Sequence, residues 1–361
     1  MGKSMKPAQR RVTIKDIAAM ANVSIGTVDR VLHKRGEVNQ QTEERVMSFV
    51  EKLGYTPNLL AKSLALKKSF NIVSLIPDAG ADNPYWKEPV TGFNRATEEL
   101  NDFHAKILVN YFDSGDVNSF VKEFNRIMDL KPDGIIMAPN FHDAAVDLMP
   151  KCKALNIPVI LFDNNLDDGS GLAYFGQNAL QSGVVAAKLM HYGLPLNARV
   201  LIFNLARNKV ITRHMMRREQ GFRQYFENNS RAQGIQIMSV EADLSKDTEP
   251  AGTLEKVFKT NPDISGIFVT NSRVHRIARY LKGVGKDKVS LIGYDLIEEN
   301  RKYLNSGAID FLICQKPEDQ GYRSAMAMFN YLLTAKQVEK VNYSAIDVII
   351  RENVDFYKNT N

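Results

Sequence analysis

Cysteine and long apolar runs are both scarce in this sequence of 361 residues. The two cysteines, Cys152 and Cys314, cannot form a disulfide framework or a zinc site, and we expect both to be small buried apolar side chains. No run approaches the roughly 18 apolar residues of a membrane helix, so we expect no membrane partner. The basic start lacks the apolar region of a signal peptide, which together with the few cysteines predicts a cytoplasmic protein.

Signatures of common cofactor and metal sites are also missing. The sequence has no Gly-x-Gly-x-x-Gly, no Walker-type lysine loop and no His-Glu-x-x-His. We therefore expect no cofactor, no metal and no catalytic residue. The composition is that of a globular protein, with 44% hydrophobic and 24% charged residues, and the length allows two or three domains.

The positive charge of the chain is concentrated at its start. Residues 1–70 hold 13 Lys and Arg against 6 Asp and Glu, whereas the remaining 291 residues hold 34 against 35. A compact basic segment on a neutral body is typical of proteins that bind phosphate groups, although a solvated tail has the same charge pattern.

Three short helices are predicted in this basic segment. Thr13 and Asp16 form a capping-box pattern at the start of the first, Ser24 caps a second from Ile25 to about His33, and Asn39 caps a third. Apolar residues at helical spacing form the inner faces: Ile14, Ile17, Ala18, Ala21, Val28, Val31, Leu32, Val46, Phe49, Val50 and Leu53. This arrangement is a helix-turn-helix unit, which leaves the outer face of the second helix free to enter the major groove of DNA.

The outer face of the second helix carries most of the expected DNA contacts: Ile25, Gly26, Thr27, Asp29, Arg30 and His33. The hydroxyl groups of Ser24 and Thr27 suit phosphate oxygens, and Arg30 is long enough to reach a guanine edge, although a solvated arginine is the alternative. The Asp29 carboxylate is repelled by phosphate unless it accepts a hydrogen bond from a base amino group or pairs with a neighbouring cation. We also expect Thr13 to contact DNA.

A short apolar segment with lysines follows. Asn58 can cap a helix of about two turns that contains Leu59, Leu60 and Leu64, and so short a helix is marginal by itself. An apolar wedge beside lysines predicts a hinge that becomes ordered in the minor groove, where Leu64 enters between base steps and Asn58 and Ala65 contact DNA. A plain linker helix packed on the body is the alternative.

These N-terminal segments resemble the head and hinge of LacI-type transcription regulators. The resemblance is carried, in order and at the correct spacing, by residues 13–18, 23–32, 55–58 and 64–65. It implies that DNA is read by four residues: Ile25, Gly26 and Arg30 at bases, and Leu64 by intercalation. The sequence departs from the family at Asp29, where serine is usual, and at His33, where asparagine is common, so we expect an operator unlike the usual one.

The rest of the chain alternates between apolar β-rich runs and helical stretches. The runs are 72–76, 107–111, 134–138, 159–162, 199–203, 266–269 and 289–293. Continuous apolar strands between amphipathic segments predict parallel sheets buried on both faces. Because seven or more units exceed one open sheet, we predict two doubly wound α/β lobes, with ligands at the carboxyl ends of the strands. A single large barrel is the alternative.

Polar and aromatic side chains collect where these strands end. They are Asn83, Tyr85, Trp86, Asp163, Asn164, Asn271, Asp295 and Gln315, and Arg218 joins them from a helix. Aromatic faces cover the C–H surface of a small polyhydroxylated ligand, while carboxylates, amides and a guanidinium bind its hydroxyls. Each residue also has a structural alternative, such as a helix cap for Asn83 or a core position for Trp86.

The body, over about 71–350, resembles the type I periplasmic sugar-binding proteins of the ribose-binding class, which supply the effector domain of LacI-type regulators. The resemblance implies that the strand-end residues above and Arg218 contact the ligand. Asn164 stands where the ribose binder has arginine, and Arg273 follows where an acidic residue is common. We therefore hypothesise a ligand other than plain ribose, with an anionic group accepted by Arg273 and by Arg207 and Lys209 if these lie nearby. A solvated basic face is the alternative.

Two other classes of function share part of this pattern. Asp163 and Asp295 are candidates for the acid/base pair of a glycoside hydrolase, but no sequence signal indicates a raised pKa in either carboxyl, and no Ser-His or Cys-His motif is present. An exported solute-binding protein would share the cleft, but it would need a signal peptide and no basic head. Operator binding by the full chain distinguishes the regulator from both.

The sequence thus predicts a sugar-responsive transcription regulator, a repressor, that binds a pseudo-palindromic operator as a homodimer. The predicted organisation is a helix-turn-helix head over 1–56, a hinge helix and linker over 57–70, and an effector domain of two lobes over 71–361. The first lobe is expected at about 71–170 and 298–322, and the second at about 171–297 and 323–350. Ligand in the cleft would change lobe closure and the spacing of the hinges, so that it either releases DNA or is required for DNA binding.

Overall fold

A computed structural model describes residues 12–33, 36, 38–55, 68–80, 83–166, 169–245 and 249–357. The chain divides into two units, 1–66 and 67–361, and each is described by itself. No helix in the described ranges is long and apolar enough to cross a membrane.

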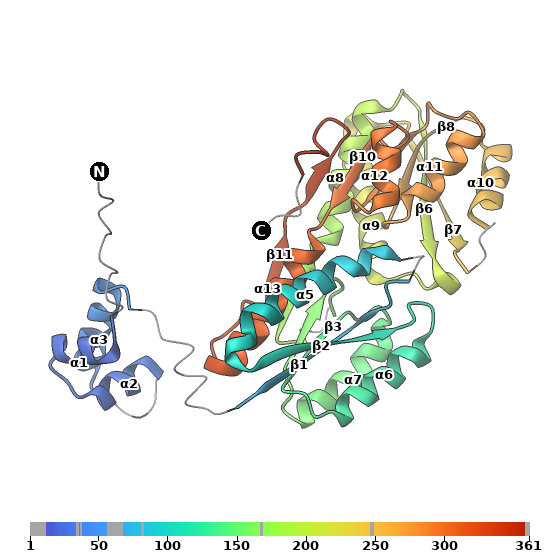
Figure 1. Ribbon diagram of the computed structural model, residues 1–361. Coiled ribbons are helices and arrows are strands. Elements are labelled where there is room, and N and C mark those ends of the chain that lie inside the picture. Colours follow the sequence, from blue (N-terminus) through green and yellow to red (C-terminus); the bar gives the residue numbers. More distant parts are fainter. Residues whose placement is uncertain are drawn as a thin grey trace, which may run out of the picture. The chain divides into compact units, whose positions relative to one another are not determined.

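The first unit is built from three helices, as predicted (Figure 1). They are α1 (Ile14–Met20), α2 (Ile25–His33) and α3 (Gln40–Lys52). The expected capping box opens α1: the Thr13 amide donates to Asp16 Oδ2 at 2.8 Å, and the Asp16 amide donates to Thr13 Oγ1 at 3.4 Å. Asn39 caps α3 through the amide of Gln41. Apolar side chains with no exposed surface close the small core: Ile17, Ala21, Val28 and Val46.

The first lobe of the second unit surrounds a parallel six-stranded sheet with the order β11-β5-β4-β3-β1-β2. Its strands are β1 (Phe70–Pro77), β2 (Ala105–Phe112), β3 (Gly134–Met137), β4 (Val159–Phe162), β5 (Ala173–Gln177) and β11 (Val341–Ser344). Its helices are α5 (Lys87–Leu100) and α13 (Pro317–Thr334) on one face, and α6 (Val117–Asp129) and α7 (His142–Ala154) on the other (Figure 1). Helices on both faces explain why the central strands are continuously apolar.

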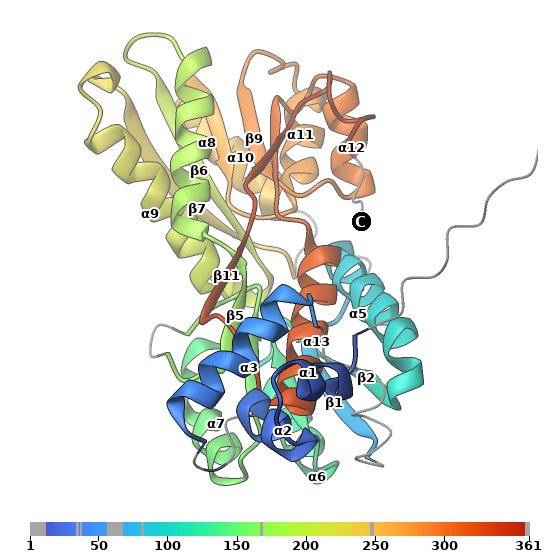
Figure 2. The same cartoon turned by 90° about the vertical axis from the view of Figure 1, so that its left-hand side faces the viewer.

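The second lobe, at the top of Figure 2, repeats this plan. The order of its strands is β12-β10-β9-β8-β6-β7. Its strands are β6 (Arg199–Ala206), β7 (Gln236–Asp243), β8 (Ile264–Val269), β9 (Ser290–Tyr294), β10 (Phe311–Cys314) and β12 (Asp347–Ile349), and β12 runs antiparallel to β10. Its helices are α8 (Ala179–Gly193), α9 (Arg213–Glu227), α10 (Glu249–Thr260), α11 (Val274–Gly283) and α12 (Glu298–Asn305). Two open sheets exclude the single barrel and confirm the doubly wound lobes.

The predicted lobe boundaries, however, are wrong. The segment 298–322, expected in the first lobe, contains α12 and β10 of the second, whereas most of α13 and all of β11 lie in the range expected for the second lobe and belong to the first. The chain crosses between lobes after β5, after β10 and after β11. Apolar runs predict that a strand is buried, but they do not indicate which of two similar sheets it joins.

Both cysteines are buried and unbonded, as predicted. Cys152 packs in the core of the first lobe and Cys314 in that of the second. Among the described residues, no group of three His, Cys, Asp or Glu is placed to hold a metal ion.

Candidate ligand cleft and candidate DNA-binding helix

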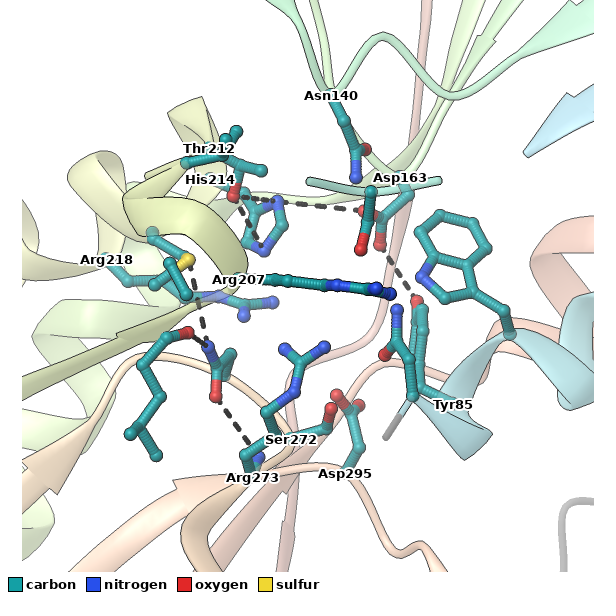
Figure 3. Close-up of a pocket in the computed structure, with 18 of the residues that line it drawn as sticks. Tyr85, Asn140, Asp163, Arg207, Thr212, His214, Arg218, Ser272, Arg273 and Asp295 are labelled. Carbon is teal, nitrogen blue, oxygen red and sulfur yellow. Dashed lines mark hydrogen bonds and ion pairs between the residues drawn. The ribbon is translucent and has the colours of Figure 1, made fainter. Parts of the chain in front are cut away.

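A cleft between the two lobes collects polar side chains at the carboxyl ends of the strands (Figure 3). It contains about 550 Å³ of space not filled by protein, part of which is open to solvent. From the first lobe it is lined by Asn83, Tyr85, Trp86, Ser114, Asn140 and Asp163. From the second lobe it is lined by the end of β6, by the segments that follow its strands and by α9: Leu205, Ala206, Arg207, Val210, Thr212, His214, Met215, Arg218, Asn271, Ser272, Arg273, Asp295 and Gln315.

The structure brings together nine of the ten residues predicted to contact the ligand. They are Asn83, Tyr85, Trp86, Asp163, Arg218, Asn271, Arg273, Asp295 and Gln315. Asn164 is not among the residues that line this cleft; it lines a separate hollow beside it. Arg207 does line the cleft, whereas Lys209, its expected neighbour there, does not.

Two buried carboxylates occupy equivalent turns of the two lobes. Asp163 follows β4 with φ 61°, and Asp295 follows β9 with φ 64°. Non-glycine residues in this left-handed region store strain of about 1–3 kcal/mol and cluster at functional sites. The strained turns place both carboxyl groups in the wall of the cleft, where they are less than a tenth exposed.

Burial sets the protonation of these carboxyl groups. Loss of hydration raises the pKa of Asp163, and it raises the pKa of Asp295 to about 7, while the Arg218 guanidinium opposes both shifts. The negative charge of Asp163 adds to the shift at Asp295. These raised pKa values could not be predicted from the sequence, because burial of a polar residue at a strand end depends on the lobe that faces it.

An aromatic pair forms the side of the cleft that belongs to the first lobe. Tyr85 donates a 2.8 Å hydrogen bond from its hydroxyl to Asp163 Oδ1. The Trp86 ring lies edge-on to Tyr85, with centroids 5.2 Å apart, and also contacts Phe162. Both aromatic side chains are buried apart from their surface in the cleft, so Trp86 is at once a core residue and a wall of the site.

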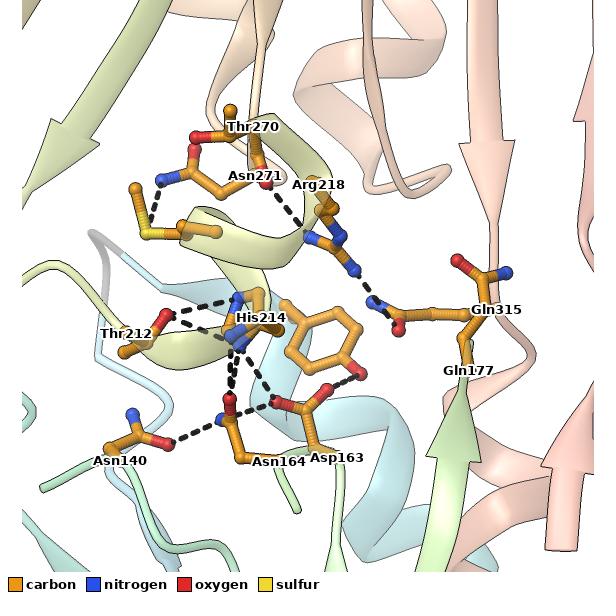
Figure 4. Close-up of polar contacts among 12 residues, drawn as sticks. Asn140, Asp163, Asn164, Gln177, Thr212, His214, Arg218, Thr270, Asn271 and Gln315 are labelled. Carbon is orange, nitrogen blue, oxygen red and sulfur yellow. Dashed lines mark hydrogen bonds and ion pairs between the residues drawn. The ribbon is translucent and has the colours of Figure 1, made fainter. Parts of the chain in front are cut away.

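Arg218 forms the opposite wall. Its guanidinium donates to the Thr270 carbonyl oxygen at 2.9 Å and to Gln315 Oε1 at 3.3 Å (Figure 4). It also lies 3.6 Å from the centroid of the Tyr294 ring. Gln315 in turn donates to the Asp295 carboxylate at 3.2 Å. A Cβ on Gly183 would lie 2.0 Å from the Arg218 carbonyl oxygen, so this glycine lets α8 approach α9 where Arg218 is held.

His214 is a cleft residue that sequence reasoning missed. Its Nδ1 lies 2.7 Å from Asn164 Oδ1 and 3.7 Å from Asp163 Oδ2 (Figure 4). Burial lowers the pKa of His214, as do the nearby cations Arg218 and Arg273, so the imidazole is neutral at pH 7. Its spacing of four residues from Arg218 on α9 was a usable signal.

The Asn164 side chain therefore lies behind the wall of the cleft and contacts residues that form this wall. Its Nδ2 donates to Asn140 Oδ1 and to Asp163 Oδ2, both at 3.1 Å, and its Oδ1 accepts from the backbone amide of His214 at 3.2 Å. The contact with His214 joins the two lobes, and the bonds to Asn140 and Asp163 lie within the first lobe; together they orient the imidazole and one carboxylate. Direct ligand contact by Asn164 stays a prediction, and in the structure its side chain lines the neighbouring hollow.

In the first unit, α2 presents an outer face to solvent. Ile25 is 49% exposed, and Gly26 and Arg30 are exposed as well, whereas Thr27 and Asp29 are half-buried. Ser24 opens the helix: its Oγ accepts from the Thr27 amide at 3.0 Å and lies 2.9 Å from Thr27 Oγ1. Thr13 is exposed at the start of α1. The predicted contacts Asn58, Leu64 and Ala65 lie outside the described residues, as does the side chain of His33.

Comparison with known proteins first defines the body. Residues 73–337 match the periplasmic binding protein domain. An ABC transporter solute binding protein from Agrobacterium vitis, bound with alpha-D-tagatopyranose, shares the fold with a TM-score of 0.71 and 22% identity, over 79% of this chain and 96% of that one. The fold and the cleft are thus those of a two-lobed periplasmic-type binding domain.

The head then defines the family. Residues 13–58 match the bacterial regulatory proteins of the lacI family. A structure from Bacteroides fragilis described as a LacI transcriptional regulator is 31% identical with a TM-score of 0.75, over 81% of this chain and 100% of that one. The ribose operon repressor of Bacillus subtilis (strain 168) is 26% identical over 300 residues, 80% of this chain and 82% of that protein. The chain belongs to the LacI family, and it is a DNA-binding, sugar-responsive transcription regulator.

Proposed function

We propose that the protein is a repressor that acts in the cytoplasm as a homodimer and binds a pseudo-palindromic operator through two copies of α2. The exposed face of α2 with Ile25, Gly26 and Arg30 carries this proposal. Ile25 can make apolar contacts in the major groove, and Arg30 can donate two hydrogen bonds to guanine. Ser24 and Thr27 place hydroxyls at the start of the same helix for phosphate oxygens.

The ligand of the cleft is a sugar or sugar derivative. Tyr85 and Trp86 offer aromatic surface, and Asp163, Asp295 and Arg218 offer charged acceptors and donors on facing walls. Each charged group is already oriented by a hydrogen bond to a neighbour, so the site loses little side-chain entropy when a ligand enters. Similarity to a ribose operon repressor and to a solute binding protein bound with tagatopyranose supports the same class of ligand.

Ligand controls operator binding through closure of the two lobes, because the cleft lies between them. A ligand that contacts both walls favours one closure of the lobes, and a near-complete switch requires about 10⁴-fold preference for one state, roughly 5.5 kcal/mol. By linkage, operator DNA changes ligand affinity by the same factor. The direction of the change distinguishes an inducer from a corepressor.

Footprinting of upstream DNA of the protein's own locus by the full chain tests this proposal. We expect a protected site with two-fold symmetry whose occupancy changes when a sugar that raises the melting temperature is added. Absence of protection at modest ionic strength, with and without sugars, would overturn it. Sedimentation of the free protein tests the homodimer.

We also propose that the cleft binds its ligand without turning it over. The raised pKa of Asp295 is the one feature that favours a hydrolase, since a general acid must hold its proton near pH 7. The relatives named above are regulators or binding proteins. Prolonged incubation with the sugars that bind should leave them chemically unchanged.

A further inference from the structure

A second chamber adjoins the ligand cleft at its outer side. It contains about 960 Å³ of space not filled by protein, including open solvent, and it shares four lining residues with the cleft: Asn83, Ser114, Arg207 and Arg273. The shared residues come from both lobes, so the two spaces meet across the gap between them. A ligand that extends from the cleft into this outer chamber must therefore pass the side chains that line both spaces.

Two guanidinium groups stand at the junction. Arg207 and Arg273 line both spaces, and their side chains are directed into the region between Asp163 and Asp295 (Figure 3). Arg207 is half-exposed and lies 3.5 Å from an oxygen of Asp113 across the gap. Arg273 is near enough to His214 to lower the pKa of that imidazole. Both positive charges therefore lie beside the space that a ligand spanning the cleft and the outer chamber would occupy.

The outer chamber repeats the chemistry of the inner one. Tyr111, at the end of edge strand β2, is 41% exposed and lines it together with Asp78. Partial burial, and the charge of Asp78, raise the pKa of the Tyr111 hydroxyl, so it remains a hydrogen-bond donor at neutral pH. An aromatic face beside a carboxylate suits a second sugar ring, in the same way as Trp86 and Asp163 suit the first ring in the cleft.

We infer that the effector is an acidic oligosaccharide of at least two sugar units. One ring occupies the cleft after the Arg207 and Arg273 side chains have moved out of the region between Asp163 and Asp295. Its carboxylate then meets these two guanidinium groups at the junction, and the next ring lies against Tyr111. A planar guanidinium pair matches a carboxylate through paired hydrogen bonds. This inference rests on the proposed function only in that the same cleft binds a sugar.

Calorimetry on the full-length protein tests it with matched sets of sugars. Each set contains a neutral monosaccharide, its uronic acid, a neutral disaccharide and a disaccharide containing that uronic acid, in the gluco, galacto and manno series. We expect one acidic disaccharide to bind at least about tenfold more tightly than both its uronic acid and its neutral counterpart, a difference of roughly 1.4 kcal/mol for each comparison.

Two variants test which residues produce the higher affinity, one for the second sugar ring and one for the acidic group. Tyr111→Ala should remove the preference for the disaccharide over the uronic acid, and Arg273→Gln should remove the preference for the acidic over the neutral compound. Tyr192→Ala, which truncates a 78% exposed tyrosine at the end of α8, is the matched control and should change neither.

Equal affinity for the uronic acid and its disaccharide, a preference that survives Tyr111→Ala, or no binding by any compound of the panel would overturn the inference. Operator binding is measured separately by footprinting. An intact footprint with failed sugar preferences contradicts only the ligand assignment, whereas a lost footprint contradicts the regulator itself.

Discussion

The side-chain amide of Gln177 donates a 3.1 Å hydrogen bond to the carbonyl oxygen of Cys314, and it thereby joins two of the three segments that cross between the lobes. The same Nε2 donates to the carbonyl oxygen of Ala345, in the third crossing, at 3.0 Å. Any change in lobe closure must turn about these three segments. Gln177 is only 3% exposed, so water does not readily replace these bonds when they are lost.

Gln177→Met should therefore destabilise the second unit and alter the coupling between ligand binding and operator binding. Two buried carbonyl groups lose their donor, and we expect the free energy of unfolding to fall by roughly 2 kcal/mol. Urea titration measures this, and operator affinity with and without ligand measures the coupling. Gln181→Met, on the exposed side of the first turn of α8, is the control. A variant as stable as the wild type would show that the crossings are held by other contacts.

Asp295→Asn should change the pH dependence of stability. The pKa of Asp295 is about 7 in the folded protein against an ordinary 3.8, so the folded state holds a proton that the unfolded chain has already released. Stability from this group is fully present below pH 3.8 and is lost as the pH rises to about 7. Asparagine cannot ionise, so the variant does not lose this stability as the pH rises. The advantage of the variant in unfolding free energy should grow by on the order of 2 kcal/mol between pH 5 and pH 8.

Chemical unfolding of the unliganded protein at both pH values gives the comparison. Asp102→Asn, at an exposed site, should show no such growth. A constant difference between Asp295→Asn and wild type at the two pH values would mean that burial does not control this carboxyl.

The fold and most of the candidate cleft were predictable because they depend on local patterns. Caps such as Thr13 and Asn39 mark helix starts within a few residues, and buried parallel strands carry a continuous apolar signal. Polar residues directly after such strands gather at one edge of a sheet for topological reasons. Asp163 and Asp295 were found in this way.

What the sequence did not reveal depends on contacts between distant segments. Sheet pairing and helix packing decide which lobe β10 or α13 joins, and these contacts leave no periodic pattern in the sequence. His214 joins the cleft only because α9 faces the turn after β4, where Asn164 binds it. Asn164 was expected in the cleft because it follows Asp163 directly, yet its side chain turns toward the neighbouring lobe.

Arg30→Ala should weaken binding to the operator far more than binding to unrelated DNA. Arg30 is exposed on the outer face of α2, and one bidentate contact with guanine contributes about 1–3 kcal/mol of discrimination. We expect about 5- to 150-fold weaker operator binding by fluorescence anisotropy at fixed salt. Arg45→Ala, at an exposed position of α3, is the matched charge control. An equal loss of affinity for the operator and for unrelated DNA would show that Arg30 contacts only phosphate groups.

Leu64→Ala should weaken operator binding while the affinity for ligand stays close to that of the wild type. The wedge interpretation assigns Leu64 to a kinked base step, and unstacking such a step is offset only by the apolar contact it permits. Anisotropy on the operator and calorimetry with the sugar give the two affinities. Unchanged operator affinity would leave residues 57–68 as a plain linker.

Gly115→Ala should weaken ligand binding through the closed state of the lobes. A Cβ at this position would lie 2.9 Å from Asn208 Nδ2 and 3.1 Å from Arg207 Cγ, both on the opposite lobe. Asn208 Nδ2 also donates to the Gly115 carbonyl oxygen at 3.1 Å, so moving this amide away from the added methyl group would break a hydrogen bond between the lobes. The added methyl group therefore opposes closure.

We expect the closed state to lose about 1 kcal/mol, and calorimetry to show ligand affinity about fivefold weaker. Gly252→Ala, within α10 where no atom lies within 4 Å of the added Cβ, is the control and should leave affinity unchanged while stabilising its helix slightly. Ligand affinity equal to that of the wild type in Gly115→Ala would mean that the lobes bind ligand without this contact.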